Sequence, residues 1–165
     1  MNHTTILTHA QIDHKIRRIA LQILESNSSS DKIILAGIAQ NGYIIAEKLK
    51  NAIADYSNVN TVLCKVSINK KELHSPITLS ITEEEYKNES VVLIDDVLNS
   101  GGTLIYGVKH FLNTPLKQLK TAVLINRNHK KYPIKADFKG LSLSTSIHEH
   151  IEVSFDHNTA TATLV

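Results

Sequence analysis

Two adjacent carboxylates followed by a turn of small residues are the part of this sequence best suited to chemistry. Asp95 and Asp96 come directly after the apolar run 91–94, and Ser100–Thr103 (SGGT) follows three residues later. Carboxylates accept hydrogen bonds from a sugar diol or hold the water molecules of a bound magnesium ion. Glycines let the backbone approach a phosphate, and the free N–H groups at the start of a helix attract an anion. The segment therefore predicts a site for a ribose 5-phosphate.

Other phosphate-binding motifs are absent from the sequence. It contains no G-x-x-x-x-G-K-[ST] and no G-x-G-x-x-G, which argues against a P-loop nucleotidase and a dinucleotide-binding fold. The purely structural interpretation is a buried strand ending in a turn, with Asp96 or Ser100 capping the next helix. Two consecutive acids at the end of a buried strand are costly without partners, so a binding site accounts for them better.

The elements that must position these residues follow from the periodicity of apolar side chains. Helices are predicted over 10–25, 43–54 and 103–112, and strands over 33–38, 61–68, 91–94 and 122–126. The alternating order predicts an α/β fold with a doubly wound, mostly parallel sheet and right-handed crossovers. The tail 141–165 alternates and is rich in Thr, Val and Ser, which predicts a short antiparallel β addition. No break in composition divides the chain, so 1–165 is expected to form a single domain.

Composition narrows the function classes. The 165 residues carry 18 Lys+Arg against 16 Asp+Glu, a net charge of +2, which excludes nucleic-acid or membrane binding driven by overall charge. A single cysteine, Cys64, excludes a disulfide framework and any multi-cysteine zinc site. No apolar run is long enough for a signal peptide or a membrane span. We expect a cytoplasmic protein with no membrane partner.

Residues 69–89 form the longest segment without a clear pattern. It contains Pro76 and the acidic run 83–85. A loop of this length in a compact α/β domain is unusual and is typical of an active-site lid. An acidic surface loop without a role in binding explains the segment equally well.

The segment 91–103 resembles the hallmark of the type I phosphoribosyltransferases, which bind 5-phosphoribosyl diphosphate there. Residues 34–49 are similar to the diphosphate-binding loop and following helix of that family. Residues 122–140 resemble the pyrimidine operon regulator/uracil phosphoribosyltransferase subfamily, with its Arg-x-His pair, Pro-Ile and Ala-Asp-Phe. The likeness covers roughly 7–153. It implies the family fold with a small hood, a Mg²⁺ cofactor, transfer of phosphoribose to a nucleobase, uracil first, and a homodimer or higher oligomer.

The resemblance also implies roles for individual residues. The ribose 5-phosphate would be held by Asp95, Asp96, Val97, Leu98, Asn99, Ser100, Gly101, Gly102 and Thr103. The diphosphate loop would be Ala39, Gln40, Asn41 and Gly42, where relatives often have a strained or cis peptide. The base would lie near Asn126, stacked on Phe138, with its edge on the backbone of Lys139. Lys70 and Lys71 would begin a mobile catalytic loop and act with Asp95, Asp96 and Asn99. Mg²⁺ would be held mainly by the substrate, with Asp95 and Asp96 reaching it through water.

Two departures from the subfamily pattern leave two functions open. Pyrimidine-regulator relatives carry arginines in the diphosphate loop and after the Thr-Gly pair, where this chain has Gln40-Asn41 and Gly102. A departing diphosphate needs cationic stabilisation, and loss of one such contact costs on the order of a hundredfold in rate. Lys70 or Lys71 could compensate. The chain is either a phosphoribosyltransferase or a catalytically weak, nucleotide-sensing regulator that binds RNA.

A local basic segment bears on the second function. Residues 127–139 carry six basic side chains, histidine included, against one acid, and the resemblance implies leader-RNA binding through such residues. The candidate RNA contacts are Lys15, Arg18, Arg127, His129, Lys130 and Lys131. A solvated loop whose lysines maintain solubility is the alternative.

Overall fold

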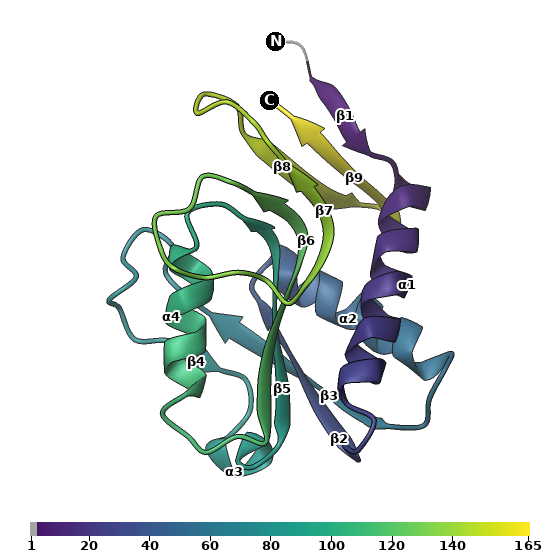
Figure 1. Ribbon diagram of the computed structural model, residues 1–165, viewed down its shortest axis with the longest axis vertical. Coiled ribbons are helices and arrows are strands. Elements are labelled where there is room, and N and C mark those ends of the chain that lie inside the picture. Colours follow the sequence, from purple (N-terminus) through teal and green to yellow (C-terminus); the bar gives the residue numbers. More distant parts are fainter. Residues whose placement is uncertain (1–2) are drawn as a thin grey trace.

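A twisted sheet built largely from parallel strands forms the centre of the computed structural model, which describes residues 3–165. Its strands are β2 (Lys32–Ile38), β3 (Asn60–Ser67), β4 (Thr78–Leu79), β5 (Ser90–Leu98), β6 (Gln118–Arg127) and β7 (Phe138–Leu143). They lie in the order β4-β3-β2-β5-β6-β7, and only β4 is antiparallel to its neighbour (Figure 1). Because β5 is central and buried on both faces, residues 91–94 within it form a continuous apolar run rather than an alternating one.

Helices cover both faces of this sheet. The helices are α1 (His9–Ser26), α2 (Asn41–Ala54), α3 (Glu83–Tyr86) and α4 (Gly102–Phe111). One apolar core lies between the sheet and α1 and α2, and a second lies between the sheet and α4. Helix α1 starts at a capping box in which Thr8 and Gln11 satisfy each other's backbone N–H groups. Within 3–165, no helix is long and apolar enough to cross a bilayer.

A second, three-stranded antiparallel sheet joins the two ends of the chain. It consists of β1 (Thr4–Leu7), β8 (Ile151–Asp156) and β9 (Thr159–Leu164), in the order β1-β9-β8. Both ends of the chain lie beside it, at the same end of the molecule (Figure 1). Leu7, Val153 and Ala162 belong to the same apolar core as α1 and α2. We infer from this shared core that the chain forms one domain.

The fold class predicted from the sequence is confirmed, and three local predictions need correction. Strand β5 continues through both carboxylates to Leu98, and the predicted loop 69–89 contains β4 and α3. These two elements are too short to show a period in the sequence. The tail is not entirely antiparallel, because 141–143 belong to β7, a parallel edge strand. Strand β1 was not predicted, since four residues that pair only with β9 carry no recognisable local pattern.

Close packing of α2 on β5 depends on Gly42. A Cβ atom at this position would lie 2.5 Å from the backbone oxygen of Ile94, which cannot move without distorting β5. We expect Gly42→Ala to lower the free energy of unfolding by about 2 kcal/mol, measured by urea denaturation. At Gly107 a Cβ would instead meet the Cδ2 atom of Leu93 at 2.7 Å, a side-chain end that can shift. Gly107→Ala is therefore the matched control, and an equal loss in both variants would contradict the backbone explanation.

Candidate functional site

A cavity of about 90 Å³ lies at the carboxyl end of β5, where the strand passes into α4. Ligands of open parallel sheets bind at such an edge. The residues that line the cavity are Lys70, Asp95, Asp96, Val97, Leu98, Asn99, Ser100, Gly101, Thr103, Leu104 and Val123. The structure thus brings the predicted 5-phosphate segment together with Lys70. Gly102 does not line the cavity, and Lys71 lies in the neighbouring, more open hollow over 70–75.

The two carboxylates line the same cavity, although neighbouring positions in a strand alternate between its faces. Asp95 faces α4 and is only 4% exposed. Burial, together with the charge of Asp96, raises the pKa of Asp95 to about 7, and the ammonium of Lys70, 3.8 Å from Oδ1 of Asp95, acts in the opposite direction. Asp95 therefore changes protonation near neutral pH.

Asp96 is held by the segment predicted to bind diphosphate. The Nδ2 atom of Asn41 donates to Oδ2 of Asp96 at 2.8 Å and to the carbonyl of Val153 in β8 at 2.9 Å. The backbone N–H of Val97 donates to Oδ1 of Asp96 at 2.8 Å. The peptide bond between Ala39 and Gln40, just before α2, is cis. The structure therefore brings the predicted diphosphate loop and the acidic pair together.

The turn before α4 depends on a glycine in the left-handed conformation. Gly101 precedes the helix with φ of +87°, a conformation that favours glycine, and Oγ of Ser100 accepts from the N–H of Gly102 at 3.2 Å. The carbonyl of Ser100 accepts from the N–H groups of Lys131 and Tyr132 at 2.8 and 3.1 Å. The basic segment predicted to contact RNA thus rests on this loop.

The three residues predicted to contact the base do not lie together in the structure. Asn126 lies level with Leu98 at the carboxyl edge of the sheet, and its buried Oδ1 has no hydrogen-bond partner among residues 3–165. Phe138 is wrong as a stacking residue. It aligns with Ala122, one position before the level of Asp95, and therefore points to the opposite face, where it packs on the core below α1 and α2. The carbonyl of Lys139 is also engaged, because Nη2 of Arg18 donates to it at 2.9 Å.

The predicted RNA contacts fall into separate places. Arg127 is wrong as a surface contact, because it is only 6% exposed and its donors are used within the protein. His129 is half-buried and bonds to the carbonyl of Thr145. Lys130 and Lys131 are exposed beside the 5-phosphate loop. Lys15 and Arg18 lie on α1 against β7, next to Lys139 and Gly140.

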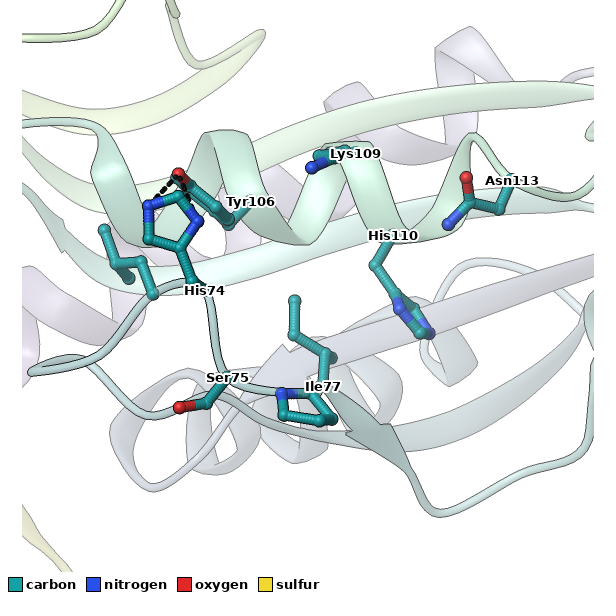
Figure 2. Close-up of a pocket in the computed structure, with 9 residues that line it drawn as sticks. His74, Ser75, Ile77, Tyr106, Lys109, His110 and Asn113 are labelled. Atoms are coloured by element: carbon teal, nitrogen blue, oxygen red, sulfur yellow. Dashed lines mark hydrogen bonds between the residues drawn. The ribbon is translucent and has the colours of Figure 1, made fainter.

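A second cavity in the structure was not predicted from the sequence. It has a volume of about 190 Å³ and lies between residues 73–77 and α4 (Figure 2). The rings of His74 and Tyr106 meet edge to face there, with centroids 5.4 Å apart, and His110 and Lys109 project from the same helix (Figure 2). These residues are far apart in sequence and follow no motif, so only the packing of α4 brings them together.

Known proteins share this sequence pattern and fold. The family model described as Phosphoribosyl transferase domain matches residues 2–159. The chain is 34% identical to the Bifunctional protein PyrR of Fusobacterium nucleatum over 157 residues, 90% of this chain and 88% of that protein. It is 31% identical to the protein of the same name from Streptococcus thermophilus, over 93% of this chain and 90% of that one.

Solved structures agree on the fold. The hypoxanthine phosphoribosyltransferase of Trypanosoma cruzi superimposes with a TM-score of 0.78 at 15% identity, over 96% of this chain and 95% of that one. A hypoxanthine-guanine phosphoribosyltransferase of Bacillus anthracis gives a TM-score of 0.72 at 19% identity, over 87% and 84%. Together with the acidic pair and the glycine-containing loop at the end of β5, these findings show that the chain belongs to the phosphoribosyl transferase domain family.

Proposed function

We propose that this protein transfers phosphoribose from 5-phosphoribosyl diphosphate to a ring nitrogen of a nucleobase, preferentially uracil, and releases diphosphate. The observation that carries the proposal is the cavity at the end of β5, where Asp95 and Asp96 adjoin the loop 99–103. In this reading the acidic pair accepts hydrogen bonds from the ribose hydroxyls, and the loop holds the 5-phosphate.

Mg²⁺ is the expected cofactor, and the donor set fits it in one particular way. Two neighbouring carboxylates offer oxygen ligands of the kind that Mg²⁺ prefers. In the described part of the chain, no group of three or more His, Cys, Asp or Glu side chains gathers as a metal site. The protein therefore fits an ion that takes most of its ligands from substrate and water, with Asp95 and Asp96 reaching it through water. Bound there, Mg²⁺ would neutralise charge on the diphosphate.

The chemical step breaks the bond between ribose C1 and a diphosphate oxygen and forms a bond from C1 to the base nitrogen, whose proton passes to the departing diphosphate. Positive charge develops on the ribose in the transition state, and the anionic acidic pair stabilises it. Lys70 lines the cavity. It would supply a positive charge for the leaving diphosphate, in place of the arginines that this chain lacks. Residues 69–77, which carry Lys70 and Lys71, would close over the site and exclude water.

Asn126 is the residue that we propose to recognise the base. Its Oδ1 is a buried acceptor without a protein donor, which is a costly state unless a ligand N–H fills it. The N–H groups of uracil suit that acceptor. Its Nδ2 atom is held by Oγ of Ser142 at 3.3 Å, which fixes the direction of the amide.

The test is calorimetric titration with 5-phosphoribosyl diphosphate and Mg²⁺, followed by a diphosphate-release assay over a panel of free bases. Binding with release that depends on uracil supports the proposal and names the acceptor. Binding without release from any base would replace it by a nucleotide-sensing regulator. Failure to bind the diphosphate would overturn both.

RNA binding is a second function that one observation favours. Helix α1 packs along the edge strand β7 (Figure 1), where Arg18 donates to the carbonyls of Lys139 and Gly140 and Lys15 lies next to Gly140. The curated relatives are named bifunctional, which supports a second activity. Because the family resemblance implies it, we also expect a homodimer or higher oligomer in the cytoplasm.

Removing charge from the face formed by α1 and β7 should weaken RNA binding. We expect Lys15→Ala/Lys139→Ala to lower affinity for a labelled hairpin RNA with a randomised loop, and to reduce the slope of log K against log salt by about 2. Fluorescence anisotropy across a salt series measures both quantities. The control Lys87→Ala/Lys109→Ala removes two exposed lysines elsewhere. Equal slopes in the two double variants would exclude the α1–β7 face.

A further inference from the structure

Arg127 is a buried cation at the carboxyl end of β6. Its side-chain nitrogen atoms donate to acceptors on residue 99 and on residues 145–149. Its Nη1 donates to Oδ1 of Asn99 in the 5-phosphate loop at 2.9 Å. Its Nε donates to Oγ1 of Thr145 at 2.8 Å. Its Nη2 donates to the carbonyls of Ser146 at 3.2 Å and Glu149 at 2.8 Å. One guanidinium thus joins the 5-phosphate loop to residues 144–150.

Within residues 3–165, no carboxylate accepts from this guanidinium. Its four partners there are an amide oxygen, a hydroxyl and two carbonyls. The pKa of the Glu149 carboxyl is lowered mainly by its hydrogen bonds with Ser146, and the charge of Arg127 adds to this. The carboxylate of Glu149 instead accepts the N–H of Ser146 at 2.6 Å, which closes the turn 146–149. A buried charge without a counter-ion is costly, so the geometry favours a role that needs the planar fork of arginine rather than an ion pair.

The segment 144–150 borders the place assigned to the base. It follows β7, whose Ser142 holds Asn126, and it ends where the N–H of His150 donates to the carbonyl of Val165 at 2.8 Å. Between these two attachments, Arg127 and His129 supply most of the side-chain contacts that hold it. The position of 144–150 therefore depends on Arg127, and Arg127 depends in part on Asn99.

We propose that Arg127 is a positioning residue that couples the 5-phosphate loop to the segment 144–150, so that binding of the ribose 5-phosphate at the loop orders the acceptor side of the site. The coupling to ligand rests on the proposed function. The link between Asn99 and 144–150 does not, because it is a property of the free protein. Coupling of this kind is reciprocal, so each of the two ligands raises the affinity for the other by the same factor.

Backbone hydrogen exchange, followed by NMR, tests the link in the free protein. The reporters are the amides of Ser146, Glu149 and His150, which are hydrogen-bonded within or next to the segment. We expect Asn99→Ala to speed their exchange by about tenfold, although the substitution lies more than forty residues away. Arg127→Lys, which keeps the charge without the fork, should give a similar or larger increase.

Asn128→Ala is the matched control. Nδ2 of Asn128 donates to Oγ of Ser144 at 3.1 Å, so this asparagine also touches the segment, but from the exposed side and without Arg127. Its exchange profile at 146–150 should match wild type. If Asn99→Ala leaves these three amides unchanged, or if Asn128→Ala affects them equally, the proposal is wrong.

The same reporters separate the coupling from the proposed function. Adding ribose 5-phosphate to wild type should protect both 100–103 and 146–150, whereas in Arg127→Lys, which leaves the lining of the cavity unchanged, it should protect 100–103 alone. Protection of 146–150 that persists in this variant overturns the coupling. If ribose 5-phosphate protects neither region in wild type, the proposed ligand is wrong, and the link is then judged from the free protein.

Discussion

The double substitution Asp95→Asn/Asp96→Asn is expected to lower kcat/KM for phosphoribosyl transfer to uracil by about a thousandfold. Hydrogen bonds to a charged group contribute about 1.5–3 kcal/mol each, and the variant removes both anions that would hold the ribose and face the developing positive charge. Asparagine keeps the volume of each side chain, but at position 96 its single oxygen can accept from only one of the two donors that Asp96 holds, Nδ2 of Asn41 or the N–H of Val97. Calorimetry should show the loss of affinity for 5-phosphoribosyl diphosphate with Mg²⁺, and the diphosphate-release assay the loss of rate.

The control is Asp156→Asn, which neutralises an exposed acid at the end of β8 that is bonded to Ser154. It should leave both measurements unchanged. Transfer that survives in the double variant within tenfold of wild type would show that the ribose does not bind at the acidic pair.

The second large effect is a stability that falls as pH rises. Asp95 has a pKa of about 7 in the folded protein, above its ordinary value of 3.8. Between these values the unfolded carboxyl loses its proton while the folded one keeps it, so the folded state binds more protons and the free energy of unfolding declines with pH. The slope is about 1.4 kcal/mol per pH unit, which gives a loss of roughly 2 kcal/mol between pH 5 and pH 7 and little further change above.

Urea denaturation of the ligand-free protein at several pH values measures this loss. Asp95→Asn removes the titrating group, so the difference in stability between variant and wild type should grow from pH 5 to pH 7 in favour of the variant. Lys70→Gln removes the cation 3.8 Å away and should move the midpoint to higher pH, whereas Lys71→Gln, at the exposed neighbouring position, should not. A difference between Asp95→Asn and wild type that is independent of pH would mean that Asp95 is ionised throughout this range.

The parallel sheet and the site at its edge were predictable because 33–38 and 91–94, the central parts of β2 and β5, are apolar without interruption and the residues of 95–103 have distinctive types in a fixed order. Such local signals require no knowledge of distant contacts. The same holds for Asn41, which the resemblance placed in the diphosphate loop and which contacts Asp96 in the structure.

The role of Arg127 was not predictable, because charge alone marks a residue as a candidate for the surface. Its burial depends on acceptors from 99 and 145–149, which only the folded chain brings to β6. The prediction that Phe138 stacks on the base was wrong for a related reason. An aromatic residue in a matching motif indicates an approximate place, but the register of β7 on β6 decides which face its ring occupies, and that register is set by long-range pairing.

The three-stranded sheet has a consequence for the order of events during synthesis. Strand β1 is made before the other described elements and pairs with β9 alone among them, so its edge stays open until β9 has emerged from the ribosome. Asn41, which donates a hydrogen bond to Asp96, also donates one to the carbonyl of Val153 in β8. The parallel sheet can collapse earlier, but the acidic pair reaches its final geometry only when β8 and β9 fold back. A nascent chain stalled before β8 would therefore be compact and largely folded, yet without a finished pocket.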